Sequence, residues 1–417
     1  MTISQPSPPQ PLIAARGLVV EYALGKQMVR AVVASTIGTS IEWYDYFLYG
    51  TMAALVFPKL FFPKADPLTG TLDSFGIFFI GFAARPVGAW IFGTYGDRIG
   101  RKAVLIVTLL LMGIATFLIG LMPTTTQIGI SAAVILVVLR TCQGLGVGGE
   151  WGGSVLMSME WGSAKRKGFL ASWPQFGVPA GLLTSTLVVA ATSAATGSNF
   201  VVWGWRIPFL LSIILVGVGL YIRLGIMETP IFRTIVEQKR IEAHPMTEVV
   251  KRNWREIVLS AFIRLPEQAP FYLFTVFVYT YGTTVLKFQR GFLVNAVSVA
   301  ALISFVTIAL SLIPHDLQYG PQAALIAESF TGRLRYSGAS LGYQLASVIA
   351  GGPAPLIATY LFAQTKNPYV ISAYILGCCI VGFVATGMLK DRSAFDHARE
   401  YEEQELSQEA ATQRVMG

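Results

Sequence analysis

The stretch Gly93-Thr-Tyr-Gly-Asp97-Arg98-Ile-Gly100-Arg101-Lys102 separates two long apolar runs, Gly76–Phe92 and Ala103–Met122. Each run approaches the length of a helix that crosses a bilayer. Because glycine permits a sharp reversal of the chain, we expect a tight turn at the membrane face over this stretch. Short loops rich in Lys and Arg stay in the cytoplasm, so the three cations place this turn on the cytoplasmic side.

The composition supports a membrane protein. The chain has 417 residues, of which 53% are hydrophobic and 13% charged, too little charge to cover a soluble globule of this size. The cations behind the net charge of +8 lie in loops and tails beside apolar runs, which favours membrane orientation over a nucleic-acid partner. Cys142, Cys378 and Cys379 lie inside apolar runs, so no disulfide or metal site is expected.

The order of apolar runs predicts an all-α polytopic protein with two helical bundles. We expect a disordered cytoplasmic arm (1–30), a six-helix bundle (31–225), a cytoplasmic linker (226–255), a shortened bundle (256–390) and a cytoplasmic tail (391–417). The second bundle is roughly 60 residues shorter than the first, about two spans of ~20 residues with their loops. We therefore expect about ten transmembrane helices rather than twelve, in an inner membrane with both termini cytoplasmic.

One segment of the second bundle allows two interpretations. Phe292–Phe330 is interrupted by Pro314-His315-Asp316 and is interpreted as one broken helix, with two short helices as the alternative. Irregular backbone at membrane depth usually lines a cavity. His315 and Asp316 are therefore candidates for a cavity wall, or for an interfacial position.

Polar and charged residues inside the predicted spans are the main functional candidates, because the bilayer disfavours them. They are Glu42, Asp45, Arg85, Arg140, Gln143, Glu150, Arg264 and Glu267. Glu42 and Asp45 are three residues apart and share a helix face. Arg140 can hold an organic carboxylate through two parallel hydrogen bonds. Structural ion pairing of the carboxylates with Arg85 or Arg140 stays open as the alternative.

A dinucleotide fingerprint also occurs, as Gly144-x-Gly146-x-x-Gly149. No strand precedes it and no βαβ pattern surrounds it, so the match is interpreted as accidental. We expect no organic cofactor, no metal and no enzymatic activity.

Six stretches of the chain together resemble the metabolite:proton symporter branch of the major facilitator superfamily, which includes shikimate, oxoglutarate, citrate and proline/betaine carriers. The stretches are the opening motif, Glu42-Trp43-Tyr44-Asp45, Arg85-Pro86, Arg140-x-x-Gln143-Gly144 through Gly149-Glu150-Trp151-Gly152-Gly153, Gly204-Trp205-Arg206-Ile207-Pro208-Phe209 and Pro270-Phe271-Tyr272. The first half looks most like the shikimate carriers.

The resemblance implies proton-coupled symport of a small, anionic organic acid by alternating access between two bundles. The proton is then the coupling ion, and the carrier is expected to be a monomer in lipid. In the family the opening motif latches the bundles at the cytoplasmic face; here its residues are Gly93, Asp97, Arg98, Gly100, Arg101 and Lys102, with Glu160 as the expected partner. Topological anchoring alone is the other interpretation of this motif.

The chain departs from the family pattern in its second half, where the second copy of the Asp-Arg-x-Gly-Arg loop is absent. A helical hairpin is therefore missing. The missing hairpin leaves open the alternative of a transport-defective remnant or membrane sensor. The mixed charges inside the spans leave open a carrier of a zwitterionic osmolyte such as proline or betaine.

Overall fold

The computed structural model describes residues 10–161, 167–229, 232, 236, 245–309, 322–327, 329–330 and 334–389, and this part of the chain contains helices and no β-strand. The first half comprises α1 (Gln10–Leu55), α2 (Phe57–Phe61), α3 (Pro67–Ala83), α4 (Arg85–Ile99), α5 (Arg101–Leu121), α6 (Thr125–Ile128), α7 (Ser131–Met159), α8 (Lys167–Thr196) and α9 (Arg206–Leu224). A short 3₁₀ helix, Gly197–Phe200, follows α8.

The second half comprises α11 (Pro245–Ile263), α12 (Leu265–Tyr272), α13 (Val278–Thr284), α14 (Arg290–Ala309), α16 (Arg335–Ala346), α17 (Ala354–Thr365) and α18 (Tyr369–Met388). Two π-helical segments interrupt it, Leu273–Phe277 between α12 and α13 and Ser347–Gly351 between α16 and α17. Insertions of this kind often mark functional sites in helices.

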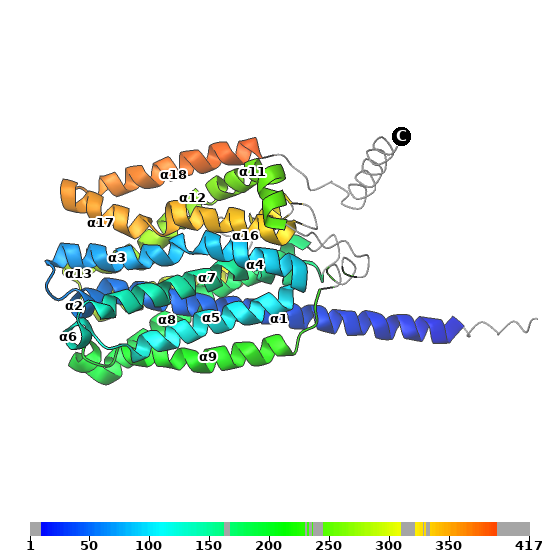
Figure 1. The fold of residues 1–417 in the computed structure, drawn as a ribbon, viewed down its shortest axis with the longest axis horizontal. Helices are drawn as coiled ribbons and strands as arrows, with labels where there is room; N and C mark the ends of the chain where they lie inside the picture. Colours follow the sequence, from blue (N-terminus) through cyan, green and yellow to red (C-terminus); the bar gives the residue numbers. More distant parts are fainter. Residues whose placement is uncertain are drawn as a thin grey trace, which may run out of the picture.

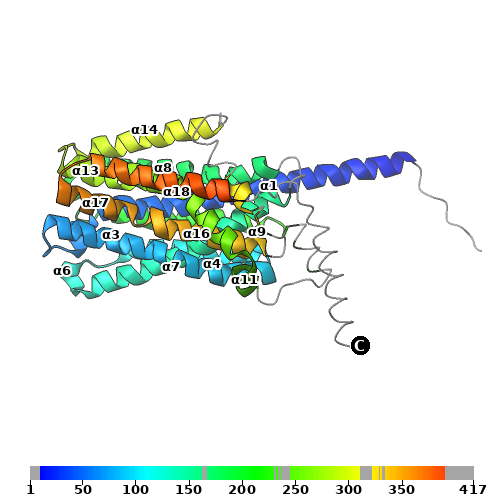
Figure 2. The ribbon, with the colours of Figure 1, turned by 90° about the horizontal axis from the view of Figure 1, so that it is seen from above.

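The long helices run side by side along the longest axis of the molecule (Figure 1). We call the end where α4 meets α5 the loop end, and the opposite end, where α2, α6 and α13 lie, the cavity end. The two halves meet where α16 packs on α4 and α7, and where α14 packs on α8. Figure 2 shows α14 and α8 as neighbours.

Seven helical stretches of the described chain are long and apolar enough to cross a membrane. They are Pro67–Ile99, Arg101–Leu121, Ser131–Met159, Gly168–Phe200, Arg206–Leu224, Arg335–Thr365 and Tyr369–Met388. Three further long stretches, α1, α11 to α13, and α14, fall outside that criterion. In α1 the charges of Glu42 and Asp45 lower the hydropathy of the helix. The all-helical fold is confirmed, while the number ten stays a prediction.

The predicted tight turn at the opening motif is wrong in its extent. Residues 93–99 form the last two turns of α4, and only Gly100, with φ 109°, leaves the helix before α5 begins. Gly93 and Gly96 serve close packing instead. A Cβ on Gly93 would press on Met246 and Ser337, and one on Gly96 would enter the ring of Tyr336.

The predicted disorder of residues 1–30 does not hold for residues 10–30, because α1 begins at Gln10. No proline occurs between Pro11 and Pro58, and the segment is rich in Ala, Leu, Arg and other good helix formers. Nothing therefore stops the helix before the first predicted span. Residues 1–9 lie outside the described part.

The predicted linker also becomes helical before its end. Helix α11 begins at Pro245 and bends at Asn253, where φ is −122° and ψ is 24°. Helix α14 covers the first apolar run of Phe292–Phe330. His315, Asp316 and the tail after Leu389 lie outside the described residues.

Candidate functional site

Two buried arginines face one tyrosine in the middle of the first half. Arg85 is the first residue of α4, and Arg140 lies within α7. The guanidinium carbon of each lies 4.2 Å from the ring centroid of Tyr46 on α1. The guanidinium carbon of Arg85 also lies 4.2 Å from the ring centroid of Phe82, and that of Arg140 lies 4.2 Å from the ring centroid of Tyr49. Aromatic faces attract cations, so these rings partly stabilise two charges that water does not reach.

Glycines bring the two arginines together. A Cβ on Gly148 of α7 would overlap the carbonyl oxygen of Arg85, and one on Gly88 of α4 would overlap that of Leu145. Small residues at these positions let α4 and α7 approach with their backbones in contact. The glycine-rich stretch of α7 lies inside a helix and positions the arginine pair.

The hydrogen-bonding capacity of the arginine pair is largely unused. Within the described part of the chain, Nε, Nη1 and Nη2 of Arg85 and Nε and Nη2 of Arg140 have no hydrogen-bond partner. Nη1 of Arg140 donates to Gln143 Oε1 at 3.0 Å, and Gln143 Nε2 donates to Thr116 Oγ1 at 2.7 Å. Leaving buried charged donors unpaired is costly, so this arrangement suits an anionic ligand.

One carboxylate lies in the same environment. Asp45 is 1% exposed, lies beside Thr116 and interacts electrostatically with Arg140. Asp45 carries one negative charge beside Arg140, while the arginine pair carries two positive charges, so one positive charge is in excess. The arginine pair with Asp45 can therefore accept an anion and still hold the ammonium group of a zwitterion.

The second half closes this cluster with an aromatic side chain. Tyr272 is the last residue of α12 and packs edge-on against Phe82. Its ring centroid lies 5.1 Å from that of Phe82 and 6.2 Å from that of Tyr46. It also interacts electrostatically with Arg85. The π-helical segment begins directly after Tyr272, so an irregular turn of the helix adjoins the cluster.

A second group of buried charges lies nearer the loop end, and we call it the Arg223 cluster. It consists of Glu42, Glu150 and Arg223, all at most 4% exposed. Arg223 Nη2 pairs with Glu150 Oε1 and lies 4.0 Å from Glu42 Oε1. For Glu42, the alternative of ion pairing with Arg85 or Arg140 is therefore wrong, because Arg223 is the cation beside it. Helical periodicity put Glu42 and Asp45 on one face, but Arg223 lies next to Glu42 and Arg140 next to Asp45.

Arg264 and Glu267 occupy the second half and pair with each other at 2.9 Å. Arg264 also donates to Gln322 Oε1 and to the Tyr343 carbonyl, at 3.3 Å each. The ring of Tyr343 stacks on Trp151 of α7 with centroids 3.6 Å apart. The ion pair of Arg264 and Glu267 therefore lies at the boundary between the halves.

The residues of the opening motif connect the two halves at the loop end. Asp97 accepts hydrogen bonds from the backbone N–H (3.2 Å) and hydroxyl (2.7 Å) of Ser337 in α16. Arg101 lies 3.8 Å from Asp97 and 3.5 Å from Glu160. We call these four residues the latch.

The residues after the sixth span complete the loop end. Glu160 Oε2 accepts from the hydroxyl of Thr229 at 2.6 Å. Glu228 accepts from the backbone N–H of Lys102 at 3.1 Å and lies against Gly100. Arg98 is exposed at the end of α4.

Several residues of these clusters escaped the sequence analysis, namely Arg223, Thr116, Tyr336 and Ser337. Arg223 had a usable signal, since it is a lone cation at the end of an apolar span. The hydroxyl residues had none, because Ser, Thr and Tyr are common in membrane helices that carry no site.

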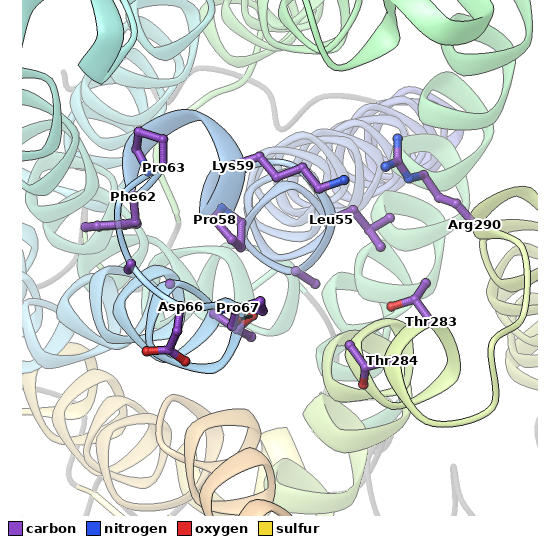
Figure 3. A pocket seen from close by; sticks show the side chains of 14 residues that line it. Leu55, Pro58, Lys59, Phe62, Pro63, Asp66, Pro67, Thr283, Thr284 and Arg290 are labelled. Carbon is purple, nitrogen blue, oxygen red and sulfur yellow. Dashed lines mark hydrogen bonds between the residues drawn. The ribbon is translucent and has the colours of Figure 1, made fainter.

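At the cavity end a cavity of about 570 Å³ is lined by α1, α2 and α3 of the first half and by α13 and α14 of the second (Figure 3). Its polar lining residues are Lys59, Asp66, Thr71, Thr283, Thr284 and Arg290. Asp66 accepts from the N–H groups of Leu68 and Thr69, both at 3.1 Å, and the hydrogen bonds from Thr69 hold the pKa of this carboxyl below its ordinary value. Lys59 and Arg290 make this cavity attractive to anions.

Comparison with known proteins identifies the family. Residues 30–260, more than half of the chain, match the family described as "Sugar (and other) transporter". The chain belongs to this family of the major facilitator superfamily. Its relatives are transporters rather than enzymes, and this major facilitator is a membrane transporter of metabolites.

Three curated relatives illustrate the range. The inner membrane metabolite transport protein YhjE of Escherichia coli (strain K12) is 35% identical over 395 residues, covering 82% of this chain and 89% of the relative. The shikimate transporter of the same strain is 36% identical over 416 residues (87% and 94%). The proline/betaine transporter of that strain is 28% identical over 418 residues (87% and 83%).

Solved structures show the same fold. The proton:xylose symporter XylE bound to 6-bromo-6-deoxy-D-glucose gives a TM-score of 0.66 at 15% identity, over 87% of this chain and 94% of that one. The inward-open form of XylE from E. coli gives a TM-score of 0.54 at 15% identity, over 87% of this chain and 95% of that one. The two-bundle major facilitator fold is thereby confirmed.

Proposed function

We propose that this transporter carries a small organic anion together with protons across the inner membrane, by alternating access between its two halves. The observation that carries this proposal is the arginine pair. Two buried guanidinium groups leave five nitrogen atoms without partners in the described chain, around a single tyrosine ring. A carboxylate placed there receives parallel hydrogen bonds from planar donors, the geometry that Arg offers and Lys lacks.

The arrangement of the halves supports alternating access. The latch joins them at the loop end, while at the other end a cavity lies between α1, α2 and α3 of the first half and α13 and α14 of the second. If the loop end is cytoplasmic, as the cation distribution predicts, this conformation opens to the outside. Substrate then enters past Lys59 and Arg290 and meets the arginine pair beneath Tyr272.

The short second half does not remove the parts that this mechanism needs. Tyr272 reaches the arginine pair, Ser337 reaches the latch, and the π-helical segments adjoin the boundary between the halves. We therefore favour a working carrier over a transport-defective remnant.

Among organic acids we favour a hydroxylated monocarboxylate resembling shikimate, since the shikimate transporter is 36% identical to this chain. A zwitterion is the second candidate, because Asp45 lies beside the arginine pair and a proline/betaine transporter is 28% identical. The charge of the ligand distinguishes the two.

The experiment is counterflow in proteoliposomes, with labelled shikimate, 2-oxoglutarate, citrate, proline, betaine and xylose tested separately. We expect exchange of a carboxylate without an ammonium group, and its loss in Arg85→Gln and Arg140→Gln. Arg30→Gln removes the same charge from an exposed position of α1 and should leave exchange unchanged. Exchange of xylose alone, or of an acid with full activity in both arginine variants, would overturn the proposal.

A further inference from the structure

The Arg223 cluster draws its three charges from three helices of the first half. Glu42 comes from α1, Glu150 from α7 and Arg223 from α9. Arg223 Nη1 donates to the Leu105 carbonyl, and Nη2 faces both carboxylates. Ser154 Oγ donates to Glu150 Oε1 at 3.0 Å. One guanidinium thus serves two carboxylates that are almost completely removed from solvent.

The charges of this cluster do not balance if every group is ionised. Two carboxylates and one guanidinium leave one negative charge, which is costly inside a membrane protein. Glu42 Oε1 and Glu150 Oε2 have no hydrogen-bond partner within the described chain. A single proton shared by the two carboxyl groups makes the cluster neutral and occupies an oxygen that otherwise lacks a donor.

We infer that Glu42 and Glu150 share one exchangeable proton against Arg223, and that this cluster is the proton site of the carrier, separate from the arginine pair. The inference rests on the proposed symport. Arg140 and Glu150 lie on the same helix, about 15 Å apart along its axis at 1.5 Å per residue. A substrate held by the arginine pair therefore does not touch the proton, and the two are coupled through the movement of the halves.

The surroundings of the cluster contain few other titratable groups. Those that the described chain brings near are Asp45 and Tyr44 on α1, and Tyr336 on α16, with Asp97 and Arg101 beyond it. Asp45 faces Thr116 and Arg140, and Tyr44 donates to the Pro208 carbonyl at 2.7 Å. Tyr336 interacts electrostatically with Glu150, Asp97, Arg101 and Arg223.

Tyr336 is the second-half residue that covers the cluster from the loop end. Its hydroxyl donates to the Gly149 carbonyl at 2.5 Å, and its ring fills the space where Gly96 and Gly153 lack a Cβ. Ser337, the next residue, holds Asp97. Opening of the latch therefore withdraws Tyr336 from Glu150. The O–H bond of the shared carboxyl then breaks, the proton passes to water at the loop end, and the electron pair stays on the carboxylate beside Arg223.

Transport provides the first test, with labelled shikimate as the probe. Wild type should exchange shikimate without a gradient and accumulate it when a pH gradient is imposed. In Glu42→Gln and Glu150→Gln we expect exchange within about twofold of wild type and at least a roughly tenfold loss of gradient-driven accumulation, because binding is kept and coupling is lost. Glu248→Gln, on the surface of α11 beside Arg252, is the matched control. Full accumulation in both cluster variants would overturn the inference.

A measurement without substrate separates this inference from the proposed function. Infrared difference spectroscopy of the reconstituted protein, titrated with acid and base, records the C=O stretch of protonated carboxyl groups. We expect one titrating band that disappears in Glu42→Gln and in Glu150→Gln and persists in Asp45→Asn. A band that persists in both cluster variants and disappears in Asp45→Asn would refute the inference. If wild type exchanges no acid, the proposed function fails, and the infrared titration still decides the proton site.

Discussion

The carboxylate of Asp97 accepts two hydrogen bonds from Ser337, 240 residues further along the chain. These bonds join α4 of the first half to α16 of the second at the loop end. Arg101 lies between Asp97 and Glu160, and the two carboxylates share its single positive charge. The residues of the opening motif thus hold the loop end closed through interactions that movement of the halves would break.

Weakening these bonds should open the loop end more often. The probe is a thiol at position 340 (Ser340→Cys), introduced after Cys142, Cys378 and Cys379 are replaced. In Asp97→Asn and in Ser337→Ala we expect this thiol to react roughly tenfold faster with a membrane-impermeant maleimide supplied at the loop end. A hydrogen bond to a charged group contributes about 1.5–3 kcal/mol, enough for that change. Both variants should insert normally, and transport should be impaired.

Thr94→Ala is the control for this experiment, because the Thr94 hydroxyl bonds only to the Trp90 carbonyl of its own helix in the described structure. Unchanged thiol reactivity and normal uptake in Asp97→Asn would reduce the opening motif to a topology signal.

The arginine pair should distinguish Arg from Lys. In Arg140→Lys the charge is kept but the planar donor is lost, so we expect substrate binding to weaken roughly 10- to 100-fold, equivalent to about 1.5–3 kcal/mol. Competition of unlabelled acid against labelled exchange measures this affinity. Arg30→Lys on the exposed surface of α1 should bind as wild type does. Equal affinity in Arg140→Lys would show that Arg140 supplies only charge.

The close approach of α4 and α7 predicts a stability effect. In Gly148→Ala the new methyl group overlaps the Arg85 carbonyl, so we expect a lower melting temperature in detergent, from an overpacking cost of about 1–3 kcal/mol. Gly76→Ala is matched to it, since a Cβ there meets no atom within 4 Å. Equal melting temperatures of the two variants would argue against this packing.

The sequence predicted several of the buried charges, although it missed Arg223, and it did not predict which of them meet. Arg85 and Arg140 were predicted as functional residues because a charge inside a membrane helix is costly, and in the structure they form the arginine pair. The separation of Glu42 from Asp45 was not predictable, because helical periodicity defines a face but not the helices that pack on it. The turn predicted at Gly93 and Gly96 was wrong for a related reason. Glycine occurs both in turns and at close contacts between helices, and the sequence does not show whether a partner helix packs on these two residues.

The orientation in the membrane stays a prediction and has a direct test. Cations concentrate at the loop end and in both terminal regions, so we expect both termini to be cytoplasmic. Reporter fusions after Gly417 and at Thr125, which begins α6 at the cavity end, should report opposite compartments. The same compartment for both fusions would contradict this topology.

The central claim is that the arginine pair binds an organic anion whose movement is driven by protons. The most direct measurement is accumulation of labelled shikimate in proteoliposomes under an imposed pH gradient, with and without a protonophore. We predict uphill accumulation that the protonophore abolishes and that Arg85→Gln and Arg140→Gln both lack, while Arg30→Gln retains it. Accumulation of shikimate that ignores the protonophore, or that survives in both arginine variants, would contradict the account.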